Sequence, residues 1–285
     1  QQKGVNVLYK KNETNDIFTL IYVFNTGTEN DPALNLAFDY LSYLGTDKMS
    51  AEQIASEMYA IACSFGLSAG TNQSWIEISG LSENMGKAME IVEGLIAGAQ
   101  PNEEILQNLK GDMIKSRADA KLNQSRCFGA LQRYMIYGSD FIRRTTLTDP
   151  ALQGLTSEQL LAKIGDLMGK QHEVLYYGPQ PQKELQSTLA AYHKVEDELA
   201  PLEKKFARPL LTDKNEVLLA QYDAKQLYYL QYSNRGEKFD LAADPAITLY
   251  NEYFGGSMNA IVFQEMREAR GLASVSYTHL TLPTT

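Results

Sequence analysis

Histidine is scarce in this chain of 285 residues: there are three, His172, His193 and His279, far apart in the sequence. A metal site built from several histidines of this chain is therefore not expected. The two cysteines, Cys63 and Cys127, form neither a disulfide framework nor a C-x-x-C zinc motif. So few cysteines suit the bacterial cytoplasm and the periplasm equally.

Positive charge is also in deficit. Lys and Arg together number 26 against 35 Asp and Glu, a net charge of −9, which argues against a surface built for nucleic acid or anionic membrane. No apolar run reaches the length of a membrane-spanning helix. What is present is ordinary for a globular protein: a 44% hydrophobic composition is enough for a sizeable core.

Strand and helix signals alternate along the first two thirds of the chain and predict an α+β fold. The β-branched and aromatic runs at 5–9 and 17–24 flank a turn-rich segment and predict a hairpin. Capping boxes predict helices after Ser50 and Thr156. Further strands are expected at 67–71, 75–79 and 173–177, and further helices after Asp31-Pro32 and near 82–96, 102–122, 126–137 and 181–193.

Polar residues in these elements suggest structural roles. In the helix 102–122 we expect Lys110 to face solvent, while Glu103 complements the dipole of the first turn. Cys63 is expected among core positions of a helix that continues to Phe65. His172 is predicted to be a partly buried histidine at a strand edge, and His193 to end a helix. No nucleophilic triad is apparent.

The opening pattern returns late in the chain. After a linker at 196–214, two strands are predicted at 217–222 and 226–232, and a helix follows Asp244-Pro245. Segments 31–36 and 244–249 nearly coincide, which suggests a tandem duplication with a period of 213 residues. The second copy stops after its first helix, so the sequence predicts a fragment with one complete unit and an incomplete one.

The stretch from Tyr253 to Ala273, YFGGSMNAIVFQEMREARGLA, resembles the pitrilysin/insulinase (inverzincin) zinc metallopeptidases. The residues that lead to Leu44-Gly45-Thr46 resemble the first helix of that family. The resemblance implies tandem α/β units, each an antiparallel-rich sheet packed by helices. We accordingly expect a complete unit at 1–195 that resembles the family's third unit, the linker at 196–214, and the start of the fourth at 215–274.

Catalytic units of the family carry H-x-x-E-H on the first helix, where two histidines bind zinc and the glutamate polarises the bound water. Counting back from Gly45, these three positions are Leu36, Asp39 and Tyr40 in this chain. Leucine has no atom that can bind zinc, and the remaining pair is not a complete set of ligands. The resemblance is therefore to the non-catalytic C-terminal half, with no metal or cofactor held by this chain.

The fourth unit of the family presents an arginine and, seven residues later, a tyrosine that stabilise charge on the substrate carbonyl. The arginine corresponds to Arg267, and the tyrosine position is Ser274. The tail 275–285 resembles a translated sequencing adapter. We hypothesise that this tail is foreign to the protein and that residue 274 was originally tyrosine.

The leading hypothesis is a fragment of the non-catalytic half of a zinc metalloendopeptidase, which contributes the chamber wall and the auxiliary catalytic Arg267. Its expected partners are a peptide substrate and the N-terminal catalytic half, which would hold the zinc. The alternative is a catalytically dead homologue that serves as a structural or partner subunit of an active peptidase. An unrelated α/β binding domain would explain neither the repeat nor the terminal motif.

Overall fold

The computed structural model describes residues 5–196, 198–203, 207–236 and 240–272. These residues divide into two compact units. The first comprises Gln1–Arg208 with Leu218–Tyr229, and the second comprises Pro209–Val217 with Leu230–Thr285. Each unit is described by itself.

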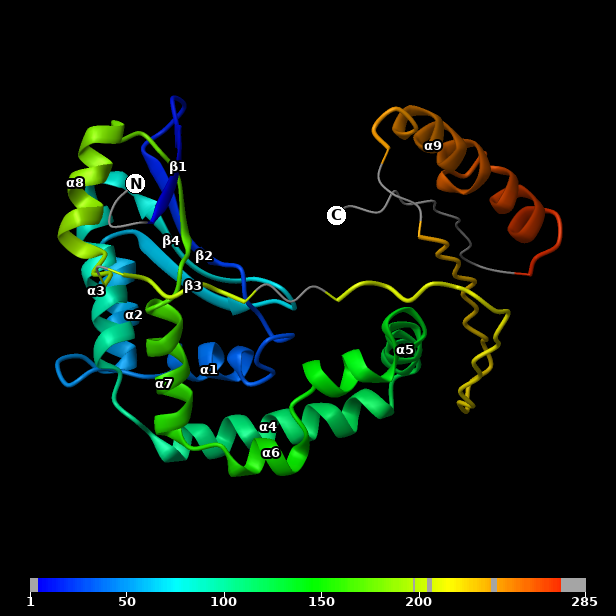
Figure 1. Cartoon of the computed structure of the whole chain (residues 1–285), viewed down its shortest axis with the longest axis horizontal. Coiled ribbons are helices and arrows are strands. Elements are labelled where there is room, and N and C mark those ends of the chain that lie inside the picture. The colour runs from blue at the N-terminus through cyan, green and yellow to red at the C-terminus, as the bar shows by residue number, and fades with distance from the viewer. Residues whose placement is uncertain (1–4, 197, 204–206, 237–239, 273–285) are drawn as a thin grey trace. The chain divides into compact units, whose positions relative to one another are not determined.

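The first unit is built on a five-stranded mixed sheet (Figure 1). Its strands are β1 (Asn6–Lys11), β2 (Ile17–Phe24), β3 (Cys63–Ala69), β4 (Ser74–Leu81) and β5 (Glu173–Gly178), in the spatial order β1-β5-β2-β4-β3. The β1–β5 pair is parallel, and the other pairs are antiparallel. The prediction of an α+β unit with an antiparallel-rich sheet is confirmed.

The predicted hairpin of the first two strands is wrong, because β5 lies between them. Val7 of β1 is opposite Val174, and Ile21 of β2 is opposite Leu175. A strand with apolar residues on both faces, such as β5, is best buried in the middle of a sheet. The turn before β2 is instead held by Asn12, whose side-chain amide donates to the Ile17 carbonyl at 3.0 Å.

Helices cover one face of this sheet. The helices of the unit are α1 (Leu34–Leu41), α2 (Ala51–Ala60), α3 (Met85–Gly98), α4 (Glu103–Lys121), α5 (Gln124–Thr145), α6 (Asp149–Gly154), α7 (Ser157–Met168) and α8 (Gln182–Tyr192), with a short 3-10 turn η1 (Ser82–Asn84). Alternate residues of β2 are fully buried beneath them: Phe18, Leu20, Tyr22 and Phe24. The alternation of a half-covered sheet thus fixes which side chains form the core.

Both predicted capping boxes are present, at Ser50 with Gln53 and at Thr156 with Gln159. The helix predicted at 126–137 ends where Gly138 adopts φ 77°, and a second helical stretch completes α5. This backbone angle is accessible to glycine at little cost.

The helix expected to run to Phe65 is shorter, because α2 ends at Ala60 and Cys63 starts β3. Cys63 is paired with Gly80 of β4. A Cβ atom on Gly80 would lie 2.4 Å from the Ala62 carbonyl oxygen, so glycine permits the close approach of these strands. Cross-strand pairing therefore overrides the helical spacing of Ile61 and Phe65.

Lys110 does not face solvent as predicted: the residue is 2% exposed. Its ammonium group donates to the carbonyl oxygens of Gln153 at 3.1 Å and Leu155 at 2.7 Å. These carbonyls belong to the C-terminal end of α6, where a positive charge is favourable. Lys110 therefore fastens α6 to α4.

We predict that Lys110→Ala lowers the free energy of unfolding by about 1–3 kcal/mol, because two carbonyl groups lose a charged donor. Lys115→Ala is the matched control, since Lys115 lies on the same helix and is exposed. Urea unfolding of the two variants measures the difference. Equal stability of the two variants would contradict the role given to Lys110.

The second unit contains α9 (Asp244–Asn251) and two π-helical turns, η2 (Glu252–Gly256) and η3 (Phe263–Glu268). The helix predicted after Asp244-Pro245 is confirmed. The strands predicted at 217–222 and 226–232 are wrong, since both segments are irregular, and most of their residues belong to the first unit. Their apolar side chains are largely exposed (Val217 at 92%, Leu227 at 82%), and a strand pair without a surface to cover its apolar face is not stable.

Candidate functional site

The three residues at the H-x-x-E-H positions of the resembled family lie on α1. Leu36 and Tyr40 are one turn apart on the buried face of this helix and are 2% and 0% exposed. Asp39 lies on the exposed face, where the Asn35 side-chain amide donates to its Oδ2 at 3.2 Å. The structure therefore brings Leu36 and Tyr40 together in the core and turns Asp39 away from them.

The Tyr40 hydroxyl is at the centre of a hydrogen-bond network. It accepts from the Asn102 backbone N–H at 2.7 Å and donates to Ser157 Oγ at 2.9 Å. The Ser157 hydroxyl in turn donates to Glu103 Oε2 at 2.9 Å. The network thus joins α1 to the N-terminal ends of α4 and α7, which the sequence places 62 and 117 residues away.

Two carboxyl groups near this network have shifted pKa values. Hydrogen bonds from the side chains of Gln107 and Ser157 lower the pKa of Glu103, so this carboxylate remains charged as an acceptor. Partial burial raises the pKa of Asp39. The Asp39 side chain is exposed and faces away from the hydroxyl network.

This arrangement does not fit a metal ion. Leu36 supplies no donor atom, and the Tyr40 oxygen is already engaged by two hydrogen-bond partners. Across the residues that the structure describes, no group of three His, Cys, Asp or Glu side chains is arranged to hold a metal. The site is a hydrogen-bonded packing contact between three helices.

Arg267, the second predicted site residue, lies in η3 of the other unit. Its side chain is 47% exposed, with Nε 3.6 Å from a Glu268 carboxylate oxygen and the guanidinium 4.8 Å from the centre of the Phe263 ring. These contacts are local and leave the guanidinium open to solvent on one side. Ser274 lies outside the described residues.

A buried group that the sequence did not predict lies between α3, β5 and α8. His172 Nε2 is 2.8 Å from His193 Nε2, and His193 Nδ1 is 2.7 Å from Glu93 Oε1. His172 Nδ1 is 2.7 Å from the Lys170 carbonyl oxygen. Both imidazoles are almost fully buried, at 5% and 6% exposure.

One signal could have paired the two histidines. His172 directly precedes β5 and His193 directly follows α8, and a helix of eleven residues is about as long as a strand of six. A helix that returns alongside its strand therefore brings its end back to the strand's beginning. Glu93 comes from α3, 100 residues from His193, and no local pattern predicts that contact.

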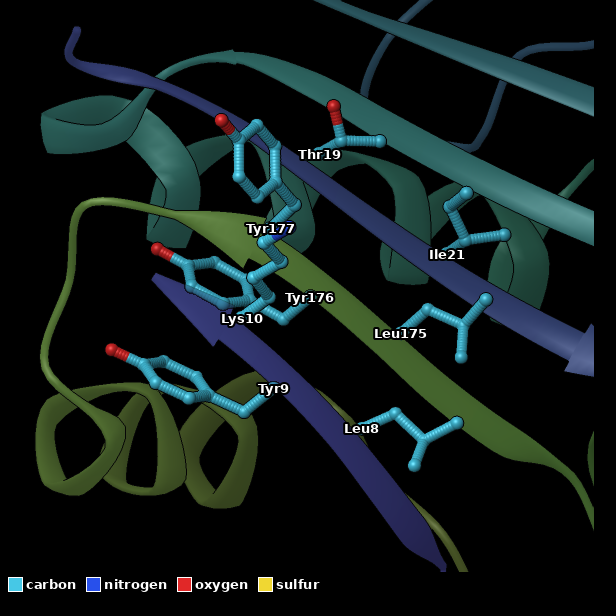
Figure 2. A pocket seen from close by; sticks show the side chains of 8 residues that line it. All are labelled: Leu8, Tyr9, Lys10, Thr19, Ile21, Leu175, Tyr176 and Tyr177. Carbon is cyan, nitrogen blue, oxygen red and sulfur yellow. The ribbon is translucent and has the colours of Figure 1, made fainter. Parts of the chain in front are cut away.

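The sheet itself carries a pocket of about 300 Å³ on β1, β5 and β2 (Figure 2). Figure 2 shows the two rings of Tyr9 and Tyr176 beside one another, and their centroids are 5.7 Å apart in a stacked arrangement. The pocket is lined by Leu8, Tyr9, Lys10, Thr19, Ile21, Leu175, Tyr176 and Tyr177. This lining includes no histidine, carboxylate or thiol, so it offers no group suited to acid–base catalysis near neutral pH.

Comparisons with solved structures identify the fold. A peptidase M16 inactive domain from Pseudomonas fluorescens superposes with a TM-score of 0.72 at 17% identity, over 98% of this chain and 69% of that one. The fold is that of an M16 peptidase domain. A protease from Helicobacter pylori also matches, with a TM-score of 0.63 at 12% identity over 98% of this chain and 70% of that one.

Sequence comparison is consistent with this M16 fold. An uncharacterized zinc protease of Streptomyces coelicolor is 24% identical over 261 residues, which is 88% of this chain and 57% of the relative. The chain thus spans little more than half the length of that curated relative. No protein-family model matches the sequence. Among the described residues, no helix combines the length and the apolarity that crossing a bilayer requires.

We predict that Tyr40→Phe lowers the free energy of unfolding by about 1–3 kcal/mol, because the Asn102 N–H and the Ser157 hydroxyl lose their shared partner. Tyr43→Phe is the control, since Tyr43 follows the same helix and is 56% exposed. Chemical unfolding curves compare the two variants. If Tyr40→Phe were as stable as the control, the hydroxyl network would not be what holds these helices together.

Proposed function

We propose that this chain is part of the non-catalytic half of an M16-type zinc endopeptidase. The observation that carries the proposal is the state of the α1 positions, where Leu36 has no donor atom and Tyr40 is committed to Asn102 and Ser157. The likeness to an M16 inactive domain supports the same assignment. In this proposal residues 1–195 are the counterpart of the family's third unit and residues 215–274 of the start of its fourth, joined by the linker 196–214.

The proposed partner is a catalytic half that holds the zinc ion, fused to this chain or present as a separate subunit. The two halves would close around a peptide, with this chain forming one wall of the chamber. Zinc in the other half would supply the activated water. The residues of this chain would shape the space in which the peptide is held and supply one positive charge.

That positive charge is assigned to Arg267. Its guanidinium is exposed enough to reach a ligand, and the Phe263 ring beneath it favours a fixed orientation. A cation that faces the substrate carbonyl stabilises the negative charge that develops on its oxygen in the transition state. Arg267 would therefore contribute to turnover and leave zinc binding untouched.

The alternative function is that of a catalytically dead homologue that supports an active peptidase subunit. The residues at the α1 positions fit this function as well as the first, because Leu36 and Tyr40 leave the chain without a metal site under both. The mass of the native protein in its source cells separates the two functions. A species long enough to include a catalytic half supports the fused enzyme, and a species with room only for the two units of this half supports the partner subunit.

We further propose that residues 275–285 derive from a sequencing adapter and that the protein has tyrosine at position 274. The seven-residue spacing from Arg267 motivates this proposal, because the resembled family has its tyrosine there. Sequencing of the source gene beyond codon 273 tests it. A genomic reading of Ser274-Val275-Ser276 would overturn the idea.

In the assembled enzyme, Arg267→Ala should lower kcat by about 10²-fold, the order found when one donor to a developing oxyanion is removed, with zinc content unchanged. Arg270→Ala is the matched control: Arg270 is equally close to a carboxylate, 3.6 Å from Glu265, and is more exposed. Peptide hydrolysis and metal analysis are measured on both variants. Equal losses of activity, or loss of zinc, would show that Arg267 has a structural role instead.

A further inference from the structure

The buried Glu93–His193–His172 group lies at the C-terminal end of α8, the last helix of the first unit. Directly after His193, the chain runs beside the turn that precedes β5. The Gln171 N–H donates to the Ala200 carbonyl at 2.8 Å, and the Ala200 N–H donates to the Gly169 carbonyl at 3.0 Å. The histidine pair therefore fastens both sides of this contact, the start of β5 and the segment 193–200, of which residues 193–196 and 198–200 are described.

The distances within the Glu93–His193–His172 group allow one arrangement of protons. His172 Nδ1 faces a carbonyl oxygen and must carry a proton, so in the neutral ring Nε2 accepts from His193 Nε2–H. These two N–H groups account for two protons. A third proton lies between His193 Nδ1 and the Glu93 carboxyl group, which share it. The three groups together carry no net charge in this arrangement, whichever partner holds the third proton.

A further proton has no place in this arrangement. It would have to bind His172 Nε2, which would put two N–H groups opposite each other across 2.8 Å. It would also add a buried positive charge, which is costly where no second counter-charge is present. Accepting that proton requires the two imidazoles to separate.

The groups packed around the pair do not provide that counter-charge. From β2, the Tyr22 ring lies 4.2 Å from the His193 ring, and the Phe24 ring lies 4.8 Å from the His172 ring. From α3 comes the single carboxylate of Glu93, and burial with the charge of Glu93 raises the pKa of Tyr22, so this phenol stays neutral. The turn before β5 contributes the Lys170 carbonyl.

We propose that the His172–His193 pair is a pH-sensitive latch, which holds the segment 193–200 against the start of β5 at neutral pH and releases it on acidification. Burial is the main cause that lowers the pKa of His172 in the closed state, and it outweighs the hydrogen bond to the Lys170 carbonyl, which raises that pKa. In the open state His193 keeps its contact with Glu93 and the shared proton, and the freed His172 has an ordinary histidine pKa near 6.5. The closed state is thus fully favoured above about pH 6.5 and loses stability as the pH falls below that value.

Hydrogen exchange of the full 285-residue chain tests the latch. After correction for the intrinsic rate, exchange of backbone amides in 193–200 should rise about tenfold between about pH 7.5 and about pH 5.5, since each pH unit below the open-state pKa adds a factor of about ten. Amides of β4 serve as the internal reference. Unchanged protection of 193–200 over this range would overturn the proposal.

Two variants sharpen the test in opposite directions. His172→Gln can still accept from His193 through its amide oxygen but does not titrate, so the rise in exchange on acidification should be largely lost. Glu93→Gln removes the carboxylate of this buried group but leaves the titrating imidazole of His172 in place, so the rise in exchange on acidification should persist. A full tenfold rise in His172→Gln would contradict the latch.

The wild-type protein provides a measurement that does not depend on the folding of either variant. In its NMR spectrum, the His172 imidazole should titrate below the ordinary histidine range. Titration of His172 at its ordinary pKa, with the segment still protected, would overturn the proposal.

Discussion

A buried phenol must find hydrogen-bond partners, and much of the first unit is arranged around the one at Tyr40. Its hydroxyl satisfies a backbone N–H at the beginning of α4 and a serine at the beginning of α7, and the serine reaches Glu103. If this hydroxyl had no hydrogen-bond partner, the folded state would lose as much free energy as several good packing contacts contribute. The same contact that fixes three helices therefore occupies the place where a metal ligand would have to be.

The consequence for function follows from geometry. Leu36 and Tyr40 share one face of α1 because residues four apart lie one above the other on a helix. In the resembled catalytic units this spacing puts two metal ligands side by side, and here it puts an aliphatic side chain beside a committed hydroxyl. The chain's proposed contribution to chemistry is then limited to the exposed guanidinium of Arg267 and to the wall that it forms.

Local signals predicted the parts of the fold that depend on neighbours in sequence. The capping boxes at Ser50 and Thr156 are decided by backbone groups within a few residues. The position of β5 between β1 and β2 could not be predicted in this way, because it brings together residues about 170 apart. Lys110 and the His172–His193 pair were missed for the same reason: their partners come from other elements, and burial of a polar group is decided by those partners.

The central claim is that the α1 positions of this chain cannot bind a metal. Calorimetric titration of zinc into the purified chain, beside a triple variant with Leu36→His, Asp39→Glu and Tyr40→His as the comparison, tests it most directly. The account predicts no stoichiometric, chelator-reversible zinc binding by the wild-type chain, because Leu36 has no donor atom and the Tyr40 hydroxyl is already paired. Stoichiometric zinc in the wild-type chain that Tyr40→Phe abolishes would contradict it.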